Sequence, residues 1–66
     1  MIVNGERSDV PAGETVAAVL YRLGLDAGAK GIAVAVDGEV LPRACWEEFA
    51  LADDARVEVL TAMQGG

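Results

Sequence analysis

The alternation of apolar and polar positions divides the chain into short segments separated by turn signals. An apolar run over residues 1–3 is followed by Asn4-Gly5, a pair that tolerates a positive φ at both positions and favours a two-residue hairpin turn. Residues 6–10 form the expected return strand, which Pro11 ends because proline has no N–H for a sheet ladder. The sequence therefore predicts a β-hairpin at the start of the chain.

A helix is predicted next, with Thr15 as its N-cap and Leu23 as its last residue. Its apolar residues recur at i, i+3, i+4 and i+7, the spacing of one helix face: Val16, Val19, Leu20 and Leu23. Gly24 can take the left-handed position after the helix, which would let Leu25 pack back on Leu20. Residues 26–30 are a short connection.

A second hairpin follows the helix. Residues 31–36 alternate between β-branched residues and alanine, and Asp37-Gly38 is a second two-residue turn signal. Residues 39–41 form the short return strand, which Pro42 closes. Because the alanine face is also apolar, the first strand of this hairpin is expected inside the sheet rather than at its edge.

The segment 44–52 contains Trp46 and Phe49, whose three-residue spacing suits a short helical or 3-10 turn lying under the sheet. Together with Tyr21, these two aromatic residues are the large side chains available to anchor a core that is otherwise rich in alanine and valine. A compact core with three aromatic anchors is expected.

The last strand is predicted over residues 56–62, after a polar turn at 53–55. Val57 and Val59 should face inward, and the charged residues that alternate with them should face outward. Residues 63–66 should leave the sheet. The chain is thus expected to form one domain over residues 1–62, with a flexible Gly-Gly tail at 63–66.

The elements therefore run hairpin, helix, hairpin, short helical turn, strand. Because one long helix can cover only one face of a sheet, the expected result is an α+β domain with a mixed sheet packed on one main helix. This order resembles the β-grasp, or ubiquitin-like, arrangement. By that analogy the last strand lies beside the first, in the middle of the sheet.

Composition narrows the possible partners and compartments. The 66 residues carry a net charge of −6, which argues against nucleic acid, since phosphate binding needs a basic surface. No apolar stretch reaches the length of a membrane span, and no signal peptide is expected before the fold. A lone Cys45 fits a reducing cytoplasm, so a cytoplasmic location is expected.

Most chemical candidates are weak. The chain has no histidine, which excludes Ser-His and Cys-His nucleophile pairs, and no metal or cofactor site is expected. Arg43 could activate Cys45, but a single cysteine in an apolar setting favours an inert role. The neighbouring acids Glu47-Glu48 and Asp53-Asp54 are best interpreted as a solvated surface, because adjacent side chains diverge.

The remaining candidate group is the α-carboxylate of Gly66. Reaction with ATP would convert this poor electrophile into an acyl-adenylate, and Gly65 keeps the tail slim enough to enter another protein's active site. Near the tail, Arg43, Leu60, Ala62 and Met63 could form a docking surface. The alternative, ordinary exposed apolar residues and a solvated arginine, stays open.

The chain as a whole resembles the small ThiS-type sulfur carriers of thiamine biosynthesis. The matching segments are Val3-Asn4-Gly5-Glu6, Gly13-Glu14-Thr15-Val16 with Leu20, residues 33–40, Pro42-Arg43 with Trp46, Leu51, Asp53, residues 56–59 and Gly65-Gly66. The Pro-Arg-x-x-Trp element combined with a terminal Gly-Gly is the most specific part. The chain departs from the usual pattern at Ala18, Leu41 and 53–55, none of which affects the tail.

This resemblance implies a complete reaction scheme. The Gly66 carboxylate would be adenylated by an ATP-dependent activating enzyme, and sulfur from a donor protein would then replace the adenylate to give a thiocarboxylate. Thiazole synthase would take that sulfur into the thiazole ring of thiamine. The chain itself would be a protein cosubstrate rather than an enzyme, and Cys45 would not carry the sulfur.

Three alternatives stay open at this point. The first is a carrier of the same fold for molybdopterin synthesis or tRNA thiolation. The second is a ubiquitin-like modifier that attaches Gly66 to lysines. The third is a β-grasp adaptor with an inert tail, for which deletion of Gly65-Gly66 would leave function intact.

Overall fold

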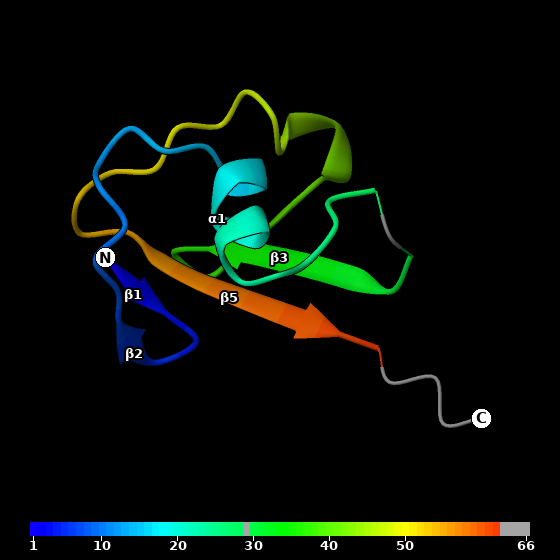
Figure 1. Cartoon of the computed structure of the whole chain (residues 1–66), viewed down its shortest axis with the longest axis horizontal. Helices are drawn as coiled ribbons and strands as arrows, with labels where there is room; N and C mark the ends of the chain where they lie inside the picture. Colours follow the sequence, from blue (N-terminus) through cyan, green and yellow to red (C-terminus); the bar gives the residue numbers. More distant parts are fainter. Residues whose placement is uncertain (29, 63–66) are drawn as a thin grey trace.

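The computed structural model describes residues 1–28 and 30–62, so the predicted tail at 63–66, with Met63, Gly65 and Gly66, lies outside the described residues. The chain forms a five-stranded sheet and one α-helix (Figure 1). In chain order the elements are β1 (Ile2–Val3), β2 (Glu6–Arg7), α1 (Val16–Arg22), β3 (Ile32–Val36), β4 (Glu39–Leu41), the 3-10 turn η1 (Arg43–Cys45) and β5 (Arg56–Thr61).

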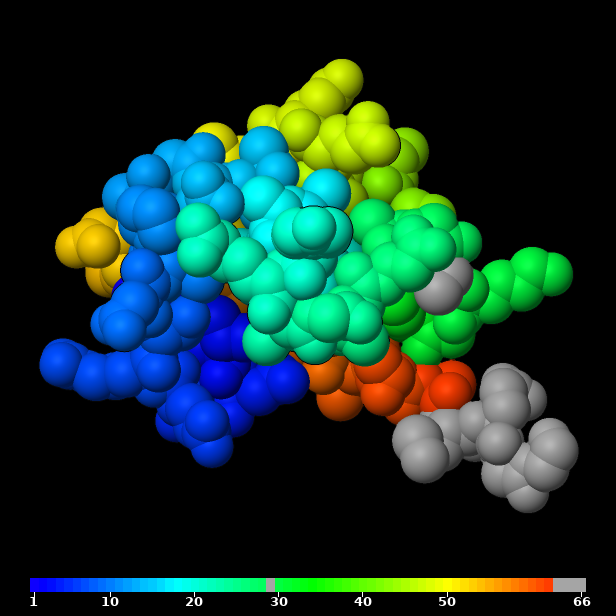
Figure 2. All heavy atoms as spheres, viewed as in Figure 1, coloured from blue at the N-terminus to red at the C-terminus, as the bar shows by residue number. Residues whose placement is uncertain are grey.

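The strand order across the sheet is β2-β1-β5-β3-β4. β1 and β5 run parallel, and the other neighbouring pairs are antiparallel. The last strand therefore lies beside the first in the middle of the sheet, and the predicted α+β arrangement of a mixed sheet on one helix is confirmed. In Figure 2, which views the molecule as Figure 1 does, α1 and the segments flanking it lie in front of the sheet.

Both predicted hairpin turns are present. Asn4 and Asp37 each adopt a positive φ, of 52° and 51°, followed by a glycine that also does so. The first hairpin is shorter than predicted, because β1 offers only two residues for pairing and β2 ends at Arg7. Val10, which was expected in the return strand, lies beyond the end of β2 and is buried in the core.

The caps of α1 follow the sequence prediction. The Thr15 hydroxyl accepts a hydrogen bond from the Ala18 N–H at 3.2 Å, which satisfies one of the free donors at the helix start. At the other end Gly24 adopts a left-handed φ of 79°, and the Leu25 N–H donates to the Leu20 carbonyl at 2.9 Å. This is the pattern of a Schellman cap, and it directs the chain back toward the sheet.

The core lies between α1 and the inner face of the sheet. Its buried members are Val3, Val10, Val16, Val19, Leu20, Val34, Val36, Trp46, Leu51, Ala55, Val57 and Val59. The inward orientation predicted for Val57 and Val59 is thus confirmed. On β3 and β5 the buried residues Val34, Val36, Val57 and Val59 alternate with exposed or half-buried neighbours, so the core lies on a single face of the sheet.

The prediction of three aromatic anchors is wrong for two of them. Trp46 is buried, but Tyr21 is 83% exposed and Phe49 is 39% exposed. Tyr21 follows the fully buried Leu20, and one residue step turns a side chain by about 100° around a helix, away from the core. Phe49 contributes its backbone instead: its carbonyl accepts from the Val16 N–H at 3.1 Å.

Leu23 was also predicted to face the core, and it is 46% exposed. It is the C-cap residue, with φ −83° and ψ 0°, so its backbone has already left helical geometry. The apolar stripe of α1 therefore ends one turn earlier than the spacing indicates.

Candidate functional site

Exposed apolar side chains occupy part of the sheet face opposite α1, beside Glu58, which lies opposite Ala35 on the same face. Leu60 on β5 is 65% exposed and Val40 on β4 is 78% exposed. Strand register places Ala33 opposite Leu60 and Ala35 opposite Val40, which joins these positions across three strands. We call the set Ala33, Ala35, Val40 and Leu60 the outer patch.

Sequence reasoning found Leu60 and missed Val40. The sequence does contain the information needed to place Val40. Asp37-Gly38 predicts a two-residue turn, and such a turn fixes which residues of the two strands lie opposite each other. In that register Val40 pairs with Ala35, on the alanine face of the strand. The strand itself was expected inside the sheet, and β3 does lie between β5 and β4, with no described element over its alanine face.

Ala62 follows β5 directly and is exposed. Its N–H donates to the Gly31 carbonyl at 2.6 Å, which continues the pairing of β5 with β3 one step beyond Thr61. Ala62 and Leu60 are therefore at the same end of β5, the end from which the remaining residues continue. The other predicted tail residues, Met63, Gly65 and Gly66, lie outside the described part of the chain.

Arg43, the fourth predicted docking residue, makes contacts within the domain. Its guanidinium lies 4.6 Å from the centroid of the Trp46 ring, and its Nη1 donates to the carbonyl of Ala27. The Trp46 indole is buried and donates to the Leu41 carbonyl at 3.0 Å. These contacts join the second hairpin, η1 and the connection after α1, and give the Pro-Arg-x-x-Trp element a structural role.

The weaker chemical candidates occupy separate surface positions. Cys45 is exposed in η1, and the acidic pairs Glu47-Glu48 and Asp53-Asp54 are exposed as well. Within residues 1–28 and 30–62 no group of histidine, cysteine or carboxylate side chains could hold a metal ion. No helix in the same ranges is long and apolar enough to cross a membrane.

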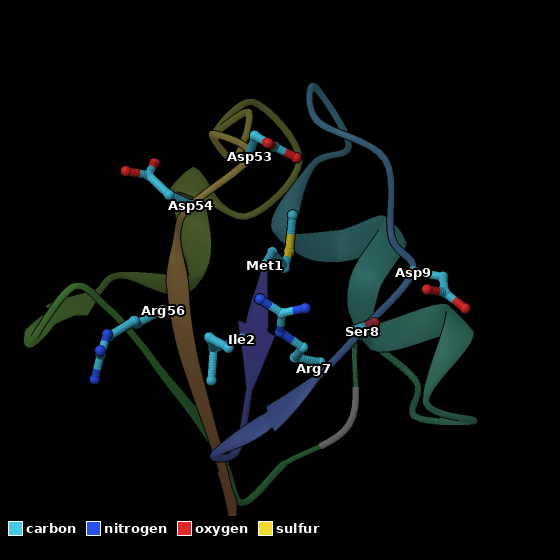
Figure 3. A pocket seen from close by; sticks show the side chains of 8 residues that line it. All are labelled: Met1, Ile2, Arg7, Ser8, Asp9, Asp53, Asp54 and Arg56. Carbon is cyan, nitrogen blue, oxygen red and sulfur yellow. The ribbon is translucent and has the colours of Figure 1, made fainter.

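An open depression lies at the other end of β5, lined by Met1, Ile2, Arg7, Ser8, Asp9, Asp53, Asp54 and Arg56. Figure 3 shows Arg7 lying across it close to Ile2, whereas Arg56, Asp54 and Asp9 point outward in different directions. Charges of both signs line the depression, and their ends do not converge on a common point. The depression therefore lacks the convergent polar groups of a small-molecule site.

Comparison with known families identifies the chain. Residues 1–66, the full length, match the ThiS family. The chain belongs to the ThiS family. This ThiS-family chain is also similar to the crystal structure of a thiamine biosynthesis protein (ThiS) from Geobacter metallireducens, with 33% identity and a TM-score of 0.75 over 98% of this chain and 96% of that one.

A solution NMR structure of a thiamine biosynthesis protein from Geobacter metallireducens gives the same result. It shares 33% identity at a TM-score of 0.74 and covers 98% of this ThiS-family chain and 85% of that chain. A thiazole synthase from Paramagnetospirillum magneticum is 30% identical over 66 residues. The ThiS-family chain spans only a fifth, 20%, of the length of that relative.

Proposed function

We propose that this chain carries sulfur for thiamine biosynthesis as a thiocarboxylate on Gly66. The observation that carries the proposal is the match to the ThiS family over residues 1–66, a range that includes Gly65-Gly66. The chain then acts as a protein cosubstrate, with residues 1–62 as the domain that partners hold and residues 63–66 as the tail that enters their active sites.

The proposed chemistry has two steps. The Gly66 carboxylate attacks the α-phosphorus of ATP in an activating enzyme, forming an acyl-adenylate and releasing pyrophosphate. Hydrosulfide delivered by a sulfur-donor protein then attacks the acyl carbon, AMP leaves, and a thiocarboxylate remains. Neither step needs a side chain of this domain, which fits the scattered positions of Cys45 and the acidic pairs.

Thiazole synthase is the proposed acceptor of the sulfur. One relative of this chain is a longer protein named thiazole synthase, in which 66 residues match this chain. This observation, together with the ThiS match, favours thiamine synthesis over molybdopterin synthesis or tRNA thiolation.

The outer patch is the proposed docking surface. It is apolar, exposed and adjacent to Ala62, so a partner that covers it would also receive the tail. Exposed apolar patches of this kind mark interaction sites in small soluble domains. Leu60 and Ala62 are the members predicted from sequence, and Met63 would extend the surface. Arg43 would contribute mainly by stabilising the domain, because it contacts Ala27 and Trp46.

The decisive experiment is intact-mass spectrometry after incubation with a cognate activating enzyme, ATP and sulfide. We expect a gain of about 16 Da, the exchange of one oxygen for one sulfur. Deletion of Gly66 should abolish this gain, because the remaining carboxylate falls one residue short of the reacting position. An unchanged mass of the wild-type chain, with an enzyme proven active on its own carrier, would overturn the proposal.

A further inference from the structure

The junction between Gly31 and Ala62 is the point at which the described chain leaves the sheet. Gly31 directly precedes β3, and Ala62 directly follows β5, so the two residues face each other at one end of the β3–β5 ladder. The hydrogen bond from the Ala62 N–H to the Gly31 carbonyl, at 2.6 Å, holds this junction closed.

Gly31 meets two separate requirements at this junction. Its φ is +80°, in the left-handed region that L side chains rarely adopt. In addition, a Cβ at this position would lie 3.3 Å from the Ala62 Cβ, 3.6 Å from its carbonyl oxygen and 3.8 Å from its nitrogen. A Cβ here would require Ala62 to shift by a few tenths of an ångström, and this shift would strain the hydrogen bond between the two residues.

Gly38, at the other end of β3, meets only the first requirement. Its φ is +86°, but a Cβ there would have no neighbouring atom within 4 Å. The two glycines thus share the same backbone constraint. Only Gly31 also lies close to Ala62, the residue immediately before the tail.

We propose that Gly31 is a positioning residue for the Gly66 carboxylate. Four residues separate Ala62 from the reacting carboxylate, and each can extend the chain by at most roughly 3.6 Å, so the reach is at most about 14 Å. With a reach this short, the anchored position of Ala62 decides where the carboxylate arrives in an enzyme that holds the outer patch. A shift of Ala62 would displace the start of this short segment, and a misplacement of about 1 Å at a reacting group can lower a rate by up to roughly 100-fold.

This inference rests on the proposed function, and the matched variants Gly31→Ala and Gly38→Ala test it. Both variants should lose thermal stability, because both place alanine at a left-handed φ, and G31A should lose more because of its close approach to Ala62. In steady-state adenylation by a cognate activating enzyme, G31A should lower kcat by roughly three- to tenfold with KM within about twofold, since docking on the patch is retained. G38A should keep both constants within about twofold of the wild type.

A second substitution provides the rescue. Ala62→Gly in the G31A background removes the atom nearest to the new Cβ, and it should restore most of the lost kcat. Amide hydrogen exchange measured by NMR gives a readout that needs no enzyme: the Ala62 amide should exchange faster in G31A than in the wild type or G38A.

The outcomes separate the two proposals. A wild-type chain that gains no adenylate from an enzyme active on its own carrier overturns the proposed function, and the role of Gly31 with it. If the wild-type chain reacts and the kcat of G31A equals that of the wild type, or falls no further than that of G38A, only the role of Gly31 is overturned. Unchanged Ala62 exchange in G31A would also overturn that role.

Discussion

The two faces of β5 differ strongly in the exposure of their apolar side chains. Val57 and Val59 are 1% and 7% exposed, whereas Leu60, the next residue along, is 65% exposed. The inner face packs on α1, and no described element covers the outer face. One strand therefore divides its side chains between stabilising the fold and, under the proposed function, binding a partner.

This division follows from the two-residue period of a strand and the presence of a single long helix. The seven-residue α1, together with buried residues such as Trp46 and Leu51, covers one side of the sheet, whereas Leu60 and Val40 on the other side are exposed. Substitutions on the two sides should therefore have separable effects: those facing α1 should change the free energy of unfolding, and those on the outer patch should change partner binding.

The largest effect is expected for Leu20→Ala, on the helix face that packs against the inner sheet. Leu20 is fully buried, so its truncation should lower the free energy of unfolding by roughly 3 kcal/mol, a large share of the stability of a domain this small. Leu23→Ala is the matched control, because it makes the same change at the half-exposed C-cap of the same helix. It should cost less than about 1 kcal/mol.

Urea denaturation followed by circular dichroism would measure both values. Equal losses for the two variants would contradict the burial difference between the two leucines. Equal losses would instead support an apolar stripe that continues to Leu23, as the residue spacing alone predicts.

A smaller effect is expected on the outer patch. Leu60→Asp should raise KM for the activating enzyme by about tenfold, because it places a charge in the apolar docking surface. Its free energy of unfolding should change by less than about 1 kcal/mol, since Leu60 is largely exposed. Kinetics and denaturation on the same preparation would separate the two quantities.

Tyr21→Asp controls for charge in this comparison. It adds the same negative charge to a chain of net charge −6, at a residue 83% exposed on the helix side of the molecule. We expect its KM to stay within about twofold of the wild type. If Y21D impaired adenylation while L60D did not, the docking surface would lie on α1 and not on the outer patch.

The smallest effect is expected for Cys45→Ser. Cys45 is exposed in η1, away from the core, so the free energy of unfolding should change by less than about 0.5 kcal/mol. The mass gain on incubation with the activating enzyme, ATP and sulfide should be the same as for the wild type. Loss of that gain in C45S would show that this thiol takes part in sulfur transfer.

Much of the fold could be predicted from local signals. The two-residue turns at Asn4 and Asp37, the N-cap at Thr15 and the left-handed Gly24 each depend on a few consecutive residues, and all are present. The aromatic anchors were predicted from hydrophobicity, which does not show which way a side chain faces. The position of Tyr21 around the helix indicated an outward side chain, whereas the exposure of Phe49 depended on packing between distant segments.

The candidate site was predictable in part for a similar reason. Alternation along β5 placed Leu60 outward, and this needed only the strand itself. Val40 and Gly31 gain their importance from pairing: Val40 lies opposite Ala35, and Gly31 contacts Ala62. Such cross-strand relations require the register, which sequence reasoning did not apply to these two positions.

The position of β5 has a consequence for protein synthesis. Of the five described strands β5 is synthesised last, yet it is the one that joins the β1–β2 hairpin to the β3–β4 hairpin. Chains grow from the N-terminus, so the two hairpins cannot be joined until residues 56–61 have been made. A chain that stopped before residue 56 would therefore contain both hairpins without the strand that unites them in one sheet.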